Sequence, residues 1–200
     1  MIEEPTVFLV DDDEAVLRSL SVLVRVVFPR VETFSSATAF LANASPDRAG
    51  CLVLDVAMPG MSGLELQRQL SEDGIDLPIV FITGHANVQM AVGAMQAGAV
   101  NFLEKPFREQ ELWDSIRSAL EIDAKHRRRK QRLDKIQSRM QRLSGGEREV
   151  LDEIMRGKSN KEIAATLGLS VRTIEDRRSR LMQKMKADSV AQLVQLALCH

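Results

Sequence analysis

The sequence is poor in cysteine and has no long hydrophobic run. Its two cysteines, Cys51 and Cys199, stand far apart without metal-ligand spacing, which predicts free thiols in a reducing cytoplasm. Arg25 interrupts the most apolar helical stretch, so no segment is long enough to cross a bilayer. Residues 1–5 lack the basic start and apolar run of a secretion signal. These absences predict a cytoplasmic protein that has no membrane partner.

The formal net charge of -1 hides two halves of opposite sign. Residues 1–124 hold 19 acids against 8 Lys and Arg, whereas residues 125–200 hold 9 acids against 19. A basic half of this kind is typical of a nucleic-acid-binding module, here joined to an acidic regulatory or metal-binding domain.

Strand and helix patterns alternate through the first half of the chain. Strands are expected over 6–10, 31–34, 51–55, 78–83 and 100–103, and helices over 14–27, 36–43, 87–97, after Ser62 and from Arg108. Such an alternation predicts an α/β doubly wound (βα)5 domain with a parallel sheet, over residues 1–123.

A long helix continues from Glu109 to about Arg142, with a helical linker expected over 124–143. Leu133, Ile136, Met140 and Leu143 form a short heptad-like seam in it. One interpretation is a solvated linker that the basic run at 125–130 keeps extended. The other is a signalling helix that pairs across a dimer or packs on one of its own domains.

The sequence pattern of residues 144–200 predicts an all-α domain of four short helices. They are expected over 147–156, 160–167, 171–185 and 190–199, and the glycine-containing turn at 168–170 is typical of a helix-turn-helix.

The strand ends of the first half carry chemically active side chains. Asp11 and Asp12 follow the first strand, Asp55 ends the third, Thr83 the fourth, and Lys105 follows the fifth. The C-terminal ends of parallel strands meet at one sheet edge, so these groups should converge. Clustered carboxylates favour Mg²⁺ (or Mn²⁺), beside which an aspartate can attack phosphorus while a lysine and a hydroxyl stabilise the phosphoryl oxygens.

The constellation Asp11-Asp12, Asp55, Thr83 and Lys105-Pro106 resembles the receiver domain of two-component response regulators. The resemblance implies that Asp55 is the phosphoacceptor. It also implies that Asp11, Asp12, Asp55 and the Ala57 carbonyl hold the metal, that Thr83, Lys105 and Phe102 form the phosphoryl-stabilising and switch group, and that His85 tunes the acyl-phosphate lifetime.

A phosphatase of the haloacid dehalogenase type uses similar parts and is the enzymatic alternative. Its Asp-x-Asp-x-Thr/Val pattern is absent, because Asp11-Asp12-Asp13-Glu14 is followed by Ala15. We therefore expect a protein that forms one acyl phosphate per chain and is not a multiple-turnover enzyme.

The C-terminal segment resembles the LuxR-type helix-turn-helix of FixJ- and StyR-like regulators, through EREVL (147–151), GKSNKEIA (157–164), LSVRTIE (169–175) and Lys184-Met185. The resemblance implies bases read by Glu175, Asp176 and Ser179. The full set of expected DNA-binding residues is Lys158, Lys161, Arg172, Thr173, Glu175, Asp176, Arg177, Ser179, Arg180 and Lys184, with Arg178 as a further backbone contact. Gly146 and Arg177 replace an arginine and a histidine of many relatives; the first is expected to weaken the start of its helix.

The resemblance to response regulators also implies partners. These are a sensor histidine kinase, double-stranded DNA at a promoter or operator, a second copy of the chain after phosphorylation, and RNA polymerase. The dimer face would include Met90, Ala91, Ala94, Met95 and Trp113. An output through protein interaction, with incidental DNA contact, is the alternative.

Overall fold

The computed structural model describes residues 4–84 and 87–198. The chain divides into two compact units, Met1–His126 and Arg127–His200. Two hydrophobic clusters form the core of the first unit and a third cluster forms the core of the second. None of the helices in the described ranges is long and apolar enough to cross a membrane.

A parallel sheet forms the centre of the first unit. Its strands are β1 (Thr6–Val10), β2 (Val31–Phe34), β3 (Gly50–Asp55), β4 (Ile79–Thr83) and β5 (Asn101–Glu104). They lie in the order β2-β1-β3-β4-β5, and each neighbouring pair is parallel. The predicted doubly wound (βα)5 architecture is confirmed.

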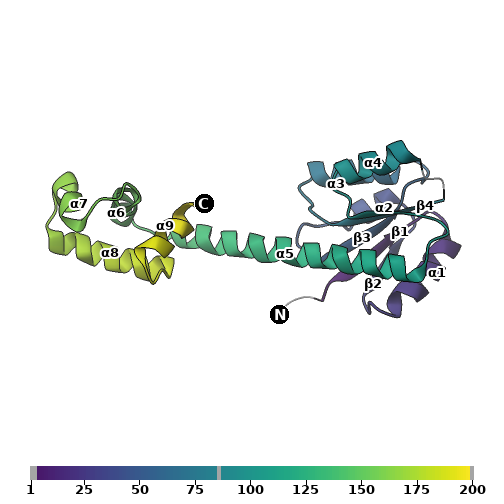
Figure 1. The fold of residues 1–200 in the computed structure, drawn as a ribbon, viewed down its shortest axis with the longest axis horizontal. Helices are drawn as coiled ribbons and strands as arrows, with labels where there is room; N and C mark the ends of the chain where they lie inside the picture. The colour runs from purple at the N-terminus through teal and green to yellow at the C-terminus, as the bar shows by residue number, and fades with distance from the viewer. Residues whose placement is uncertain (1–3, 85–86, 199–200) are drawn as a thin grey trace. The chain divides into compact units, whose positions relative to one another are not determined.

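Helices cover both faces of this sheet, which explains why its central strands are apolar without a break. All six residues of β3 are buried. Helices α1 (Glu14–Arg25) and α5 (Glu109–Gln141) pack on one face, while α2 (Ala37–Leu41), α3 (Gly63–Glu72) and α4 (Val88–Gln96) pack on the other (Figure 1). A strand buried on both faces needs apolar side chains at successive positions.

Short polar side chains start the helices of the first unit. The Asp13 carboxylate accepts hydrogen bonds from two backbone N–H groups of α1, and Ser62 caps α3 in a capping box with Glu65. Helix α1 ends two residues before the predicted end. The N–H groups of Val27 and Phe28 both bond the Val24 carbonyl, which tightens the chain ahead of Pro29.

The second unit consists of helices around one core. They are the C-terminal part of α5, then α6 (Gly145–Met155), α7 (Asn160–Leu167), α8 (Val171–Met185) and α9 (Val190–Leu198). Ser159 and Ser170 cap α7 and α8 as predicted, and Gly168 ends α7 with a left-handed φ of 67°. Glycine adopts this conformation without the steric cost that a Cβ would bring.

Helix α6 begins earlier than the sequence predicted. Ser144 is its N-cap, and Ser144 and Glu147 form a capping box, so Gly145 and Gly146 lie inside the first turn. The two bonds of this box offset the low helix propensity of the glycines. The expectation that Gly146 weakens the start of this helix therefore missed its stabilising cap.

The seam at the end of α5 belongs to the core of the second unit. Ile136 and Leu143 are 2% and 5% exposed, and Met140 packs against the same cluster, whereas Leu133 stays 38% exposed. The Arg139 guanidinium also donates to the Met185 carbonyl at the end of α8. Ile136, Met140 and Leu143 thus pack on their own domain, and the solvated-linker interpretation is wrong for these three residues.

Candidate phosphoacceptor site and DNA-binding face

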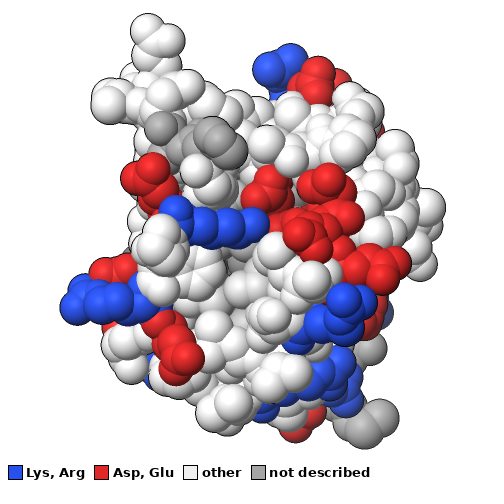
Figure 2. Space-filling model, turned by 90° about the vertical axis from the view of Figure 1, so that its right-hand side faces the viewer, with Lys and Arg blue, Asp and Glu red and all other residues white. Residues whose placement is uncertain are grey.

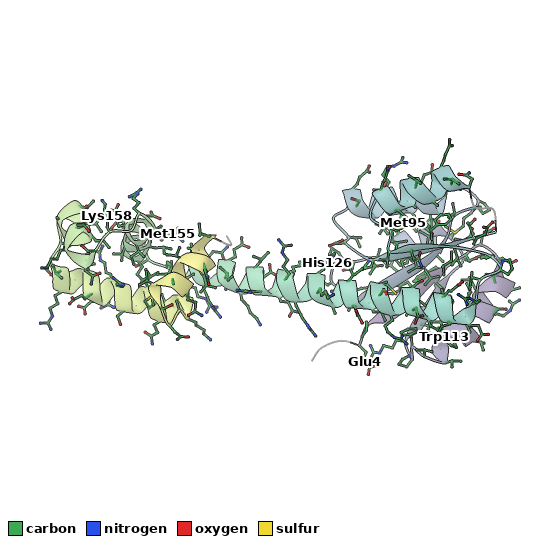
Figure 3. The ribbon with its side chains drawn as sticks, viewed as in Figure 1. Glu4, Met95, Trp113, His126, Met155 and Lys158 are labelled. Carbon is green, nitrogen blue, oxygen red and sulfur yellow. The ribbon has the colours of Figure 1, made fainter. Side chains whose placement is uncertain are left out.

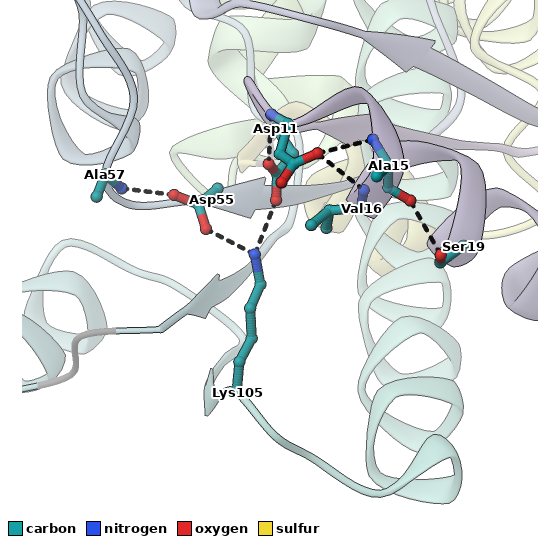
Figure 4. Close-up of polar contacts among 8 residues, drawn as sticks. Asp11, Ala15, Val16, Ser19, Asp55, Ala57 and Lys105 are labelled. Atoms are coloured by element: carbon teal, nitrogen blue, oxygen red, sulfur yellow. Dashed lines mark hydrogen bonds and ion pairs between the residues drawn. The ribbon is translucent and has the colours of Figure 1, made fainter.

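The acidic site lies where β1 and β3 end side by side. Val10 pairs with Leu54, so Asp11 and Asp55 follow at neighbouring positions, and they are 2% and 6% exposed. Lys105 reaches them from the end of β5: its Nζ lies 2.8 Å from Asp11 Oδ2 and 2.9 Å from Asp55 Oδ1 (Figure 4). One ammonium group therefore bridges two buried carboxylates.

Backbone groups hold the other oxygen of each carboxylate. Asp11 Oδ1 accepts from the Asp13 N–H at 2.9 Å, and Asp55 Oδ2 accepts from the Ala57 N–H at 2.7 Å. Burial raises the pKa of Asp55, and Lys105 offsets only part of that rise. Burial opposes the charge of Lys105, but its hydrogen bonds to Asp11 and Asp55 outweigh burial and raise its pKa.

Two further predicted residues lie at or near this edge. Thr83 is buried at the end of β4, next to the end of β3, and its carbonyl accepts from the Lys105 N–H at 2.8 Å. Phe102 is half-buried in β5, with its ring centroid 6.0 Å from that of Phe81. His85 lies outside the described residues.

The charge at this edge suits a hard cation, although the three predicted carboxylates are not gathered. Asp11 and Asp55 share a single ammonium, which leaves one negative charge uncompensated, and Mg²⁺ prefers oxygen donors of this kind. Asp12 is exposed. Within residues 4–84 and 87–198, no group of three or more His, Cys, Asp and Glu side chains is arranged to hold a metal. Figure 2 shows a group of acidic side chains near the middle of the face it presents, with Lys and Arg side chains around it.

Helix α8 presents a polar face on the second unit. The predicted residues that are exposed there or on α7 are Lys161, Arg172, Glu175, Asp176, Ser179 and Arg180. Ile174, Leu181 and Met185 point into the core and fix which face of α8 remains outside. Four of them are charged residues of α8, and none of these four makes an ion pair with another described residue: Arg172, Glu175, Asp176 and Arg180.

The other predicted DNA contacts are already engaged within the unit. Lys158 lies 2.5 Å from Glu153, and Lys184 lies 2.6 Å from Glu147. Arg177 pairs with Glu149 at 3.3 Å and Arg178 donates to Asn160 at 2.6 Å. The Thr173 hydroxyl lies 2.8 Å from that of Ser170, at the helix cap. These contacts give each side chain a structural role within the unit.

Comparison with known proteins identifies both units. Residues 7–117 match the response regulator receiver domain, and residues 141–197 match the bacterial regulatory proteins of the luxR family. The chain is a two-component response regulator with a LuxR-type DNA-binding domain. The response regulator protein TodT of Pseudomonas putida is 45% identical over 95% of this chain and 84% of its own length.

Other relatives are similar in sequence over nearly the whole length of this response regulator. The transcriptional regulatory protein FixJ of Rhizobium meliloti is 44% identical over 96% of this chain and 95% of its own. A solved structure of the response regulator StyR is 45% identical, with a TM-score of 0.91 over 98% of this chain and all of its own. The relatives are named as regulators and not as enzymes, in agreement with the prediction that this chain is no enzyme.

Two buried glutamates of the DNA-binding domain are residues that the sequence reasoning missed. Glu147 and Glu153 are only 3% and 5% exposed. Burial opposes the charge of Glu147, but Lys184 and the Ser144 cap outweigh it and lower the pKa of Glu147. The spacing Ser144-x-x-Glu147 is a capping-box signature that the sequence already carries.

The predicted dimer face of the receiver needs correction at one position, Ala94. Ala94 is fully buried, and the Trp113 indole donates to the Leu23 carbonyl of α1, on the other side of the sheet from α4 (Figure 3). Ala94 is therefore not placed to contact a partner, whereas Trp113 is half-buried. The exposed apolar residues of α4 are Val88, Val92 and Met95.

Gly146 and Arg177, the two positions at which the resemblance implied a departure from the family pattern, meet in the structure. A Cβ at position 146 would lie 2.6 Å from the Arg177 guanidinium. Glycine at 146 therefore leaves the space in which Arg177 lies against α6 and pairs with Glu149.

Proposed function

We propose that this response regulator accepts a phosphoryl group on Asp55 from a sensor histidine kinase and controls transcription by binding double-stranded DNA through α8. The observation that carries the proposal is the Lys105 ammonium held between Asp11 and Asp55 at one end of the sheet. This arrangement combines a nucleophilic carboxylate with a cation for phosphoryl oxygens, which phosphoryl transfer requires.

In the proposed transfer, an oxygen of Asp55 attacks the phosphorus of a phosphohistidine on the kinase. A P–O bond to Asp55 forms, the P–N bond breaks, and its electron pair leaves with the imidazole. Lys105 then donates to a phosphoryl oxygen instead of to Asp55 Oδ1, and the Thr83 hydroxyl donates to another. The Ala57 N–H holds Asp55 in place, as its 2.7 Å bond to Oδ2 suggests.

Mg²⁺ or Mn²⁺ would be held by Asp11, Asp12, Asp55 and the Ala57 carbonyl. When bound, such an ion neutralises charge on the phosphoryl group and so lowers the cost of bringing an anion to a carboxylate. The uncompensated charge shared by Asp11 and Asp55 supports this assignment.

The DNA-binding half of the proposal rests on α8. Glu175, Asp176 and Ser179 lie exposed on the outer face, where acids can accept from cytosine, and Arg172 and Arg180 flank them to contact phosphates. Phosphorylation would shift the receiver toward a dimer-competent population, with Thr83 and Phe102 as the switch and with Val88, Val92 and Met95 of α4 at the interface. RNA polymerase would be the further partner at a promoter.

Two measurements test the phosphorylation half. The full chain is incubated with Mg²⁺ and a small acyl phosphate, and its intact mass is followed in the wild type and in Asp55→Asn. We expect the wild type alone to gain one phosphoryl group. Sustained release of phosphate from an ester substrate would instead indicate a phosphatase. Sedimentation with and without beryllofluoride then reports whether the wild type, and not Asp55→Asn, becomes a dimer.

Duplex binding tests the transcription half. The full chain should bind DNA with an affinity that falls steeply with salt. Glu175→Gln should change the preferred sequence more than the overall affinity, as expected for a base-facing residue. Absence of duplex binding at low salt would refute this half and favour an output through protein interaction.

A further inference from the structure

The second half of α5 and the residue that follows it carry an unusually dense positive charge. Residues 125–142 contain nine Lys and Arg against a single acid, Asp134. Residues 128–135 are all exposed, so the core of the second unit uses none of this stretch. Like charges three and four residues apart repel one another on a helix. Residues 128–135 therefore weaken the helix through like-charge repulsion and contribute no buried side chain to the core.

Four of these cations lie on one side of α5. Arg128, Arg132, Lys135 and Arg139 are spaced by four, three and four residues, which at 3.6 residues per turn places them within a sector of about 60°. Asp134 falls on the opposite side. We name this set the α5 basic stripe. It lies entirely in the second compact unit, together with α8.

Contacts within the second unit show where the stripe leads. The guanidinium of Arg139 donates to the Met185 carbonyl at 3.0 Å, so this side of α5 adjoins the C-terminal end of α8. Among the residues that the structure describes, no acid pairs with Arg128, Arg132 or Lys135, and all three are exposed. Arg128, Arg132 and Lys135 thus lie farther along α5 from the point where Arg139 contacts the C-terminal end of α8, the helix with the predicted base contacts.

We propose that the α5 basic stripe binds the phosphate backbone of duplex DNA next to the bases that α8 reads. From Arg128 to Arg139 the helix rises about 16 Å, which matches roughly five phosphates along one strand. A duplex fits better than an acidic protein because the cations are regularly spaced and carry no interleaved acid or aromatic group. This inference rests on the proposed DNA-binding function and adds affinity without sequence preference.

The test measures salt dependence with the full chain. A mixed-sequence 40-base-pair duplex is titrated by fluorescence anisotropy between about 50 and 200 mM KCl, for the wild type and for Arg128→Gln/Arg132→Gln/Lys135→Gln. If each side chain meets one phosphate, the slope of log K against log salt falls by about 2.7. The wild type then loses about 40-fold more affinity over this range than the triple variant does.

Matched variants separate position from charge. Arg132→Gln and Lys130→Gln remove the same charge two residues apart, but only Arg132 is on the stripe, so only Arg132→Gln should reduce the slope. Arg132→Lys should keep it. An unchanged slope in the triple variant, or tighter binding, overturns the inference while leaving α8 as the DNA contact. Absence of duplex binding by the wild type is a different result, because it refutes the proposed DNA-binding function itself.

Discussion

Lys105→Met should destabilise the receiver unit strongly at neutral pH. The substitution keeps the apolar stem of the side chain and removes the ammonium that lies 2.8 Å from Asp11 and 2.9 Å from Asp55. Two carboxylates that are 2% and 6% exposed would then face each other without a counter-charge.

The expected cost follows from the burial of the three groups. Removing one partner of a fully buried ion pair costs about 3–5 kcal/mol. The Lys105 side chain is 26% exposed, so the lower end, about 3 kcal/mol, applies. With a urea m-value of about 1–3 kcal/mol per molar, the unfolding midpoint falls by roughly 1–3 M. The loss should shrink in acid, because a protonated Asp55 no longer needs the ammonium.

The single tryptophan of the chain makes the assay specific. Trp113 lies in the receiver unit, where its indole bonds the Leu23 carbonyl, so its fluorescence follows unfolding of this unit alone. Asp55→Asn/Lys105→Met is the matched control and should recover much of the loss, because one carboxylate is removed. A midpoint for Lys105→Met that equals the wild type, or a control that recovers nothing, would refute the charge argument.

Three further predictions concern single side chains. Asp55→Asn should be more stable than the wild type at pH 7. Because burial raises the folded-state pKa of Asp55, the wild type alone loses stability as pH rises from the ordinary carboxyl pKa toward the raised value. Urea midpoints of the two proteins that run parallel across pH would contradict this. Glu147→Gln should lower the stability of the second unit by about 2 kcal/mol at pH 7, the size expected for hydrogen bonds to a charged group. Since the folded pKa of Glu147 is lowered, its contribution is present above the unfolded pKa and lost as pH falls through the folded one, so the difference between the melting temperatures should vanish in acid. Gly146→Ala should displace the Arg177 guanidinium, whose atoms lie 2.6 Å from the new Cβ. If the displaced Arg177 side chain then contacts one DNA phosphate, the slope of log K against log salt steepens by about 0.9. In an Arg177→Gln background the same change should have no effect.

The strand ends and helix caps were predictable because they depend on neighbours in sequence. An apolar run that stops at Asp55 states both where β3 ends and which edge it reaches, and Ser159 before an apolar stripe states where α7 starts. Parallel topology then brings Asp55, Thr83 and Lys105 to one edge.

Contacts between distant elements were not predictable in this way. Lys158 and Lys184 have the exposed, cationic pattern of phosphate contacts, yet each neutralises a buried glutamate. The contact of the Trp113 indole with the Leu23 carbonyl depends on α1, which is distant in sequence, so the sequence near Trp113 does not predict it. The Gly146–Arg177 contact spans two helices, and no local pattern reports which side chain fills the space above a glycine.

The burial of Ile136 and Leu143 bears on how such proteins exchange parts. The helices expected to bind DNA start near residue 144, but folding of that domain also uses apolar groups from the last two turns of α5 and from Leu143, which follows it. A recombination event or an engineered fusion joined at 144 would discard two buried side chains, at about 1.5–3 kcal/mol each. A junction near residue 127 would keep them and carry the basic helix along. A foreign sensor domain would therefore have to accept this helix as the continuation of its own last element.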